Sequence, residues 1–110
     1  MELPAEVERL RIFIGEGDKY DGKPLYEAIV LLARKKGLAG ATVLKGVMGF
    51  GCTSRIHTAK VLRLSEDLPM VVEIVDKPER IQTFLPDIDT MLQEGLVTLE
   101  KVRVIAYRHR

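Results

Sequence analysis

The chain opens on alternating apolar and polar positions over residues 7–14. Leu10, Ile12 and Ile14 fall on one side of an extended chain, and the arginines between them fall on the other. A period of two residues is typical of a strand with one buried face. Residues 15–22 are rich in glycine and acidic residues, so they are predicted to form a loop.

Residues 24–36 have the apolar spacing of an amphipathic helix. Pro24 stands at the first helical position, basic residues fill the last turn, and Gly37 follows them. These residue types favour a helix start and a helix end. The apolar positions that recur at three- and four-residue steps are Leu25, Ala28, Ile29 and Leu32.

A second helical pattern begins at Asp76 and ends at Gly95. Asp76 and Glu79 have the spacing of a capping box, and apolar residues follow at helical steps. Pro86 lies inside the pattern and has no backbone N–H to donate. We therefore expect a kink or a break near residues 83–85.

Four other segments have the residue types of strands. Residues 41–48 and 61–64 are apolar and β-branched and flank a cationic loop, so they are predicted to pair as a long hairpin. Residues 70–75 form a near-continuous apolar run, typical of a central strand. Within it, Glu73 is expected to lie at a subunit edge or beside a cation, because an unpaired buried charge is costly. The last strand is predicted over residues 96–107.

This order of elements predicts an α+β, ferredoxin-like βαββαβ fold, an antiparallel sheet with two helices on one face. With 110 residues and 46% hydrophobic content, residues 1–110 are expected to form a single domain. The uncovered face of the sheet is expected to carry Phe13, Val43, Val47, Val71, Val75 and Ile105. Because that surface is too apolar for water, we expect a homo-oligomer that buries it between subunits.

The composition narrows the class of protein. Lys and Arg total 17 and Asp and Glu total 16, and a net charge of +1 argues against a nucleic-acid-binding module. No apolar run is long enough to cross a membrane and the start lacks a secretory pattern, so we expect a cytoplasmic protein with no membrane insertion. Cys52 is the only cysteine, which excludes an intrachain disulfide and a CxxC metal knuckle.

The candidate chemistry lies in residues 37–64. No Asp or Glu occurs between residues 38 and 65, so the cations of this stretch have no acidic neighbour in sequence. Glycine lets backbone N–H groups approach a phosphate, so glycines followed by a cationic loop indicate an anion site. The loop residues expected to contact an effector or a partner are Ser54, Arg55, His57 and Lys60. An ordinary exposed hairpin loop with solvated cations explains the same spacing.

Several motifs here are similar to those of a known family. The run Gly37-Leu38-Ala39-Gly40-Ala41-Thr42-Val43, followed by Gly49-Phe50-Gly51, resembles the second strand and loop base of the nitrogen-regulatory PII signal-transduction proteins. The surrounding sequence resembles more closely a family of small PII-like domains of unknown function. The matching runs include Gly22-Lys23-Pro24-Leu25-Tyr26 and Leu64-Ser65-Glu66-Asp67-Leu68-Pro69. Several runs in unchanged order make this more specific than a lone glycine motif.

The resemblance implies a trimer that binds adenine nucleotides in the clefts between subunits and uses a long loop to engage transporters or enzymes. On this basis Thr42 lies near the adenine, and Gly49, Phe50 and Gly51 form the loop base that closes over the nucleotide. With Arg103 and the two residues after it aligned to the last strand of PII, Arg108 takes the place of a phosphate-contacting arginine. The resemblance therefore implies that Arg103 and Arg108 are also nucleotide-binding residues.

Two departures from the PII pattern affect the expected ligand. The glycine-rich phosphate loop of PII is reduced to Glu94-Gly95-Leu96, which favours a nucleotide with fewer phosphates than ATP. The tyrosine that PII proteins carry for covalent modification is absent from residues 49–62, which argues against nucleotidylation there. AMP, ADP and ATP are the candidate effectors, and no cofactor is required.

The hypothesis is therefore a non-enzymatic homotrimer in which an anionic effector binds at the subunit cleft and residues 49–62 engage a regulated partner. The alternative is a metal-binding trimer of the CutA type, or a small enzyme, in which His57 and Cys52 are the working residues. His109 is the third candidate metal ligand, although these residues lack close ligand spacing. Ser54 and His57 could act as a nucleophile and base, but no positioned acid completes the set.

Overall fold

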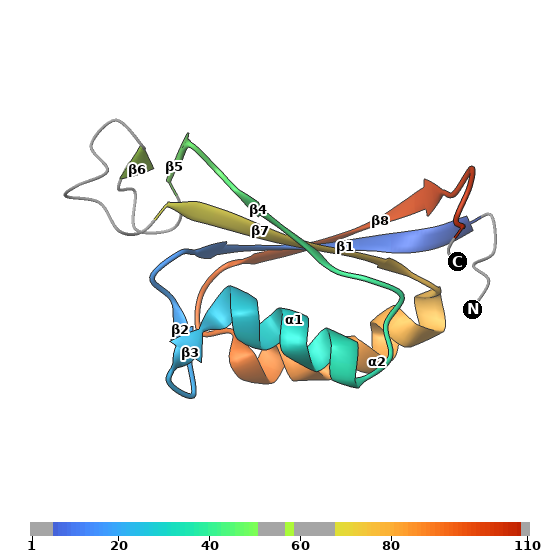
Figure 1. Cartoon of the computed structure of the whole chain (residues 1–110), viewed down its shortest axis with the longest axis horizontal. Helices are drawn as coiled ribbons and strands as arrows, with labels where there is room; N and C mark the ends of the chain where they lie inside the picture. Colours follow the sequence, from blue (N-terminus) through green and yellow to red (C-terminus); the bar gives the residue numbers. More distant parts are fainter. Residues whose placement is uncertain (1–5, 51–56, 59–67, 109–110) are drawn as a thin grey trace.

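The computed structural model describes residues 6–50, 57–58 and 68–108 of the chain. A four-stranded antiparallel sheet forms one layer, and two helices on the same face form the other (Figure 1). In spatial order the strands are β4 (Thr42–Lys45), β7 (Pro69–Asp76), β1 (Glu6–Gly15) and β8 (Leu96–Arg103). The helices are α1 (Leu25–Lys35) and α2 (Pro78–Met91). The predicted α+β fold with two helices on one face is thus confirmed.

Two short hairpins extend from this body. The strands β2 (Lys19–Tyr20) and β3 (Lys23–Pro24) pair just before α1, and β5 (Met48–Gly49) pairs with β6 (His57–Thr58) beyond the end of β4. In Figure 1 the β5–β6 hairpin projects from one end of the sheet. No helix in the described ranges is long and apolar enough to cross a membrane.

The core lies between the sheet and the helices. The strands contribute alternate residues, as expected for one buried face, and each helix contributes one apolar stripe. The fully buried side chains include Leu10, Ile12, Ile29, Val72, Ile74, Ile81 and Phe84. Because burying one such side chain contributes about 1.5–3 kcal/mol, this layer holds the helices against the sheet.

A kink or a break was expected near residues 83–85, and the break is wrong because the second helix is continuous from residue 78 to residue 91. Pro86 and Gln82 are both exposed, and water can therefore satisfy the Gln82 carbonyl that Pro86 leaves without a donor. The capping-box interpretation is also wrong, because the N-cap residue is Lys77 and no side chain caps the helix. Asp76 instead accepts hydrogen bonds from Ala39 N–H over 2.8 Å and Lys77 N–H over 2.7 Å.

The observed boundaries of the last strand and of the first helix differ from the predicted ones. The last strand ends at Arg103 rather than at residue 107, and α1 begins at Leu25 with Pro24 as its N-cap residue. The expected partner of β4, residues 61–64, lies outside the described residues. Within the sheet, β4 pairs with β7.

Candidate functional site

The sheet face opposite the helices carries side chains in rows that cross all four strands. One row is apolar and consists of Leu44, Val71, Phe13 and Leu96, which are successive cross-strand neighbours. The two edge members are the most open, since Leu44 is 52% exposed and Leu96 is 56% exposed. We call this surface the open face. An apolar row that reaches both edges of a sheet is a surface suited to protein contact.

The next row on the open face is polar and consists of Thr42, Glu73, Arg11 and Thr98. Arg11 donates from Nε to Glu73 Oε2 over 2.8 Å, and its Nη1 lies 3.6 Å from Glu100 Oε1. The expectation that Glu73 lies beside a cation is therefore confirmed.

Arg9 and Glu100 extend this polar group across β1 and β8. Arg9 donates to Glu100 Oε1 from Nη2 over 2.7 Å and from Nε over 3.2 Å. This hydrogen bond raises the pKa of Arg9 and lowers the pKa of Glu100 from their ordinary values. Together with Arg11 and Glu73, the pair forms a group with no net charge. Such a group can be covered by another protein surface without leaving an unpaired charge.

The sequence pattern predicted the face on which Arg9 and Arg11 lie, but it did not identify the acidic residues that pair with them. Alternation over residues 7–14 puts Arg9 and Arg11 on one face, whereas the identity of the paired acids depends on strand register. A signal was present, because Glu73 and Glu100 both lie within segments predicted as strands.

The open face differs in part from the expected one. Of the six apolar residues expected there, the sheet places three on it: Phe13, Val71 and Val75. Val43 is a cross-strand neighbour of Val72 and packs against the core, so the open face carries Leu44 instead. Val47 and Ile105 lie outside the four strands of the sheet. Neighbouring strand residues point to opposite faces, so an error of one residue exchanged Val43 for Leu44.

The candidate nucleotide residues Thr42 and Arg103 lie on opposite edges of the sheet. Thr42 begins β4 and shares a row with Thr98, whereas Arg103 ends β8 and pairs with Glu6. They are separated by three strand spacings and five residues along the strand, or about 22 Å at usual strand dimensions. One chain therefore does not bring these two residues together.

Gly46, between β4 and β5, and Gly49 of the loop base both pack closely against Pro69. A Cβ at residue 46 would lie 2.7 Å from Pro69 Cγ, and one at residue 49 would lie 3.1 Å from the same atom. Gly46 N–H also donates to the Pro69 carbonyl over 2.7 Å. Close approach to Pro69 thus accounts for glycine at Gly46 and favours it at Gly49. Phe50, the next candidate, is 68% exposed.

Arg108 follows a residue that is fixed to the segment before β4. The Tyr107 hydroxyl donates to the Ala39 carbonyl over 3.4 Å, and the Ala39 N–H donates to the fully buried Asp76. Ala39 precedes Thr42 by three positions. The exposed Arg108 and Thr42 therefore belong to neighbouring segments, unlike Thr42 and Arg103.

Several predicted residues lie outside the described ranges: Gly51, Ser54, Arg55 and Lys60, and also Cys52 and His109. His57 is described only as a member of β6. The roles of these residues stay predictions. In the rest of the chain, no three His, Cys, Asp or Glu side chains form a group that could hold a metal ion.

Comparison with solved structures identifies the fold. The chain is similar to CPII, a nitrogen regulatory PII-like protein from Thiomonas intermedia K12 bound to ADP, AMP and bicarbonate. The TM-score is 0.61 at 16% identity, over 90% of this chain and 88% of that one. CPII bound to ADP, AMP and acetate gives a TM-score of 0.52 at 20% identity, over the same shares. The protein has a PII-like fold.

Sequence comparison then gives the family. Residues 7–104 match DUF190, described as an uncharacterized ACR. The chain is 44% identical over 96 residues to a UPF0166 protein of Aquifex aeolicus (strain VF5), covering 87% of this chain and 90% of the relative. It is 34% identical over 96 residues to the UPF0166 protein MJ1524 of Methanocaldococcus jannaschii, covering 86% and 88%. The chain belongs to the DUF190 (UPF0166) family, as the resemblance to small PII-like domains implied.

Proposed function

We propose that this protein is a non-enzymatic, PII-like regulator that binds an adenine nucleotide between the subunits of a cytoplasmic homotrimer. The nucleotide orders residues 49–62, and that loop then engages a transporter or an enzyme. A ligand that favours one loop state by about 1–3 kcal/mol is sufficient for such coupling.

The observation that carries this proposal is the placement of Thr42 and Arg103 on opposite edges of one sheet. A neighbouring copy that sets its β8 edge beside the β4 edge of the first brings Thr42 of one copy to Arg103 of the other. Such a contact joins two different surfaces, and it forms a ring when the rotation between copies closes.

The open face supplies a reason for the copies to associate. Its apolar row runs from Leu44 on the β4 edge to Leu96 on the β8 edge, and its ionised side chains are paired with one another. A second copy would therefore bury apolar surface without desolvating an unpaired charge.

The choice of nucleotide rests on the short connection between α2 and β8. Only residues 92–95 link them, which leaves little backbone for a phosphate-binding loop. We therefore expect AMP or ADP to bind more tightly than ATP. The presence of ADP and AMP in the CPII structures supports the same ligand class.

Calorimetric titration with AMP, ADP and ATP, alongside light scattering for the mass in solution, tests this function. The wild-type protein is expected to be a trimer with saturable nucleotide binding. Arg103→Ala and Arg108→Ala should each weaken binding at least about tenfold, because a hydrogen bond to a charged group contributes about 1.5–3 kcal/mol. The control Arg34→Ala removes an exposed arginine of α1 and should bind as the wild type does.

Three results would count against the proposal: a monomer, no saturable nucleotide binding, or arginine variants that bind as the wild type does. The alternative metal-binding trimer predicts a different outcome, in which a divalent metal binds and the binding is lost in His57→Ala. The small-enzyme alternative has no further support from the described residues.

A further inference from the structure

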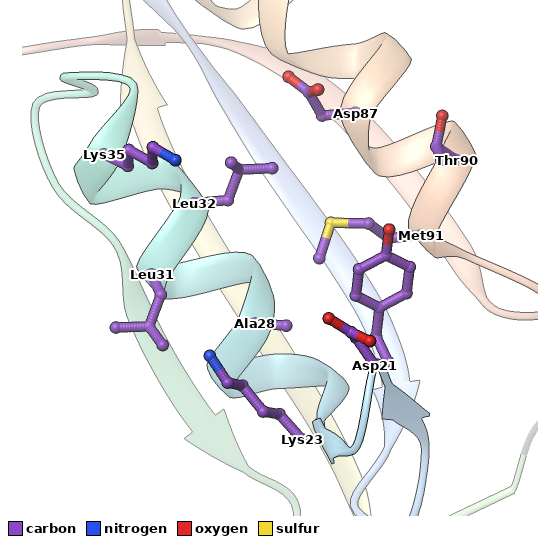
Figure 2. A pocket seen from close by; sticks show the side chains of 10 residues that line it. Asp21, Lys23, Ala28, Leu31, Leu32, Lys35, Asp87, Thr90 and Met91 are labelled. Carbon is purple, nitrogen blue, oxygen red and sulfur yellow. The ribbon is translucent and has the colours of Figure 1, made fainter.

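The helix layer contains a trough that the proposed nucleotide site does not use. It lies between α1 and α2, has a volume of about 430 Å³, and ends at the turn between β2 and β3 (Figure 2). Its apolar floor is formed by Ala28 and Leu32 of α1 and Met91 of α2. Hollows of roughly 300–1,000 Å³ with an apolar lining accommodate small organic molecules.

An ion pair neutralises the acidic residue at the opposite end of the trough. Asp87 of α2 lines this end, and its Oδ2 lies 2.8 Å from Nζ of Lys36 at the end of α1. The Asp87 carboxylate therefore already has a cationic partner. It adds little net negative charge to the trough.

Two lysines on the rim have no such partner. Figure 2 shows Lys23 and Lys35 along the α1 side of the trough, with Leu31 between them. Neither lysine makes an ion pair with another described residue, and Leu31 is 45% exposed. Asp21, at the β2–β3 turn, is the acid of the lining that makes no ion pair with a described residue. Among the described residues, the lining charges that lack an ion-pair partner are thus two positive and one negative.

We propose that this trough binds a small amphipathic anion with a short apolar body and a single carboxylate. The apolar body contacts Ala28, Leu32 and Met91, and the carboxylate pairs with Lys23 or Lys35. Both lysines have long, flexible side chains, so the acid group can be held at either end. The two unpaired lysines favour an anion over a cation, and the single unpaired acid disfavours a second negative charge.

The trough is independent of the proposed nucleotide site. The helices lie on one face of the sheet and the open face is the other (Figure 1). A second copy that covers the open face therefore leaves the trough accessible. The proposal holds or fails separately from nucleotide binding.

Amide chemical shifts of the full-length protein during titration with octanoate test the proposal directly. Octylamine and inorganic phosphate serve as comparison probes, because each keeps only one property of the ligand, the chain or the negative charge. We expect saturable shifts from octanoate at Ala28, Leu32 and Met91. Neither comparison probe should reproduce them.

Charge variants test the role of the rim. Lys23→Ala/Lys35→Ala should weaken octanoate binding at least tenfold, whereas either single variant should have a smaller effect. The control Lys19→Ala/Arg34→Ala removes two exposed cations outside the trough lining and should bind as the wild type does.

Asp21→Asn tests the sign of the electrostatic effect. It removes the opposing carboxylate and should tighten octanoate binding roughly twofold to fivefold, the size expected of one exposed charge interaction. The proposal is overturned if octylamine binds as well as octanoate, or if the double lysine variant binds like its control. It is also overturned if octanoate changes the amide chemical shifts of open-face residues and not those of the trough. All of these substitutions are at the surface, so the variants are expected to fold.

Discussion

Gly46 and Pro69 lie in such close contact that a Cβ added to Gly46 would fall 2.7 Å from Pro69 Cγ and 3.3 Å from the Pro69 carbonyl oxygen. The Gly46 N–H donates to that same carbonyl. The contact joins the end of β4 to the start of β7, which are the two strands that flank the candidate loop. The geometry of the loop base thus depends on a residue with no side chain.

Gly46→Ala should destabilise the protein by about 1–3 kcal/mol, because the alanine methyl group can fit only if the Pro69 ring or the backbone beside it moves. Gly49→Ala should have a smaller effect, since its Cβ would lie 3.1 Å from the ring. Gly40→Ala is the matched control, because nothing lies within 4 Å of a Cβ at that position. Urea denaturation measures all three. Equal stability of the Gly46 and Gly40 variants would show that the contact is not tight.

Asp76→Ala should cost about 3 kcal/mol. The fully buried Asp76 carboxylate accepts the N–H groups of Ala39 and Lys77, and its removal leaves both donors without a partner. Asp76→Asn keeps one acceptor oxygen and should cost less. Asp89→Ala removes an exposed acid from α2 and is the control for the loss of one negative charge. Thermal and urea unfolding of the three variants would contradict this account if Asp76→Ala resembled Asp89→Ala.

Glu100 should contribute to the acid dependence of stability. The hydrogen bond from Arg9 lowers the pKa of Glu100 below its ordinary value of 4.5 in the folded chain. Its stabilising contribution is therefore complete above about pH 4.5 and is lost as the pH falls through the lower folded-state pKa. The difference in urea midpoint between wild type and Glu100→Gln should shrink between pH 6 and pH 3.

The matched control for this pH series is Glu27→Gln, which removes an exposed acid of α1. The difference between wild type and Glu27→Gln should change less over the same range. A wild-type advantage over Glu100→Gln that grew on acidification would contradict the direction of the pKa shift. Added salt should reduce the effect, because the pair is accessible to solvent.

Leu44→Glu should prevent self-association without unfolding the chain. Leu44 is a half-exposed member of the apolar row, and a carboxylate there would have to be desolvated in the interface. Leu31→Glu places the same charge on the helix side, at a residue that is also half-exposed, and should leave the assembly intact. Sedimentation velocity distinguishes the two. Loss of assembly in both variants, or in neither, would argue against association through the open face.

Much of the fold could be predicted from the sequence because its signals are local. Alternation identified the core face of β1, and apolar spacing with terminal Pro24 and Gly37 identified α1. The predicted helix break at Pro86 was wrong, because the position is exposed and water can replace the hydrogen bond that proline cannot donate. The predicted capping role of Asp76 was also wrong. Its buried carboxylate accepts a hydrogen bond from the N–H of Ala39, which is distant in sequence, and does not cap α2.

The candidate site was less accessible to sequence reasoning, because it depends on register and on neighbouring copies. The pairing of Arg11 with Glu73 requires the register of two strands 62 residues apart. Lys23 and Lys35 share a trough only through the packing of α1 against α2. The separation of Thr42 from Arg103 likewise emerges only once the strand order is known.

Nucleotide binding by mixed subunits tests the central claim most directly. Thr42→Glu puts a carboxylate on the β4 edge and Arg103→Ala removes the guanidinium from the β8 edge, so each variant alone should bind ADP poorly. In a mixed trimer, some interfaces combine an intact Thr42 from one copy with an intact Arg103 from another. The account predicts that ADP binding returns when the two defective variants are unfolded, mixed and refolded together. Binding that stays absent in mixed trimers of confirmed composition would contradict a site built from two copies.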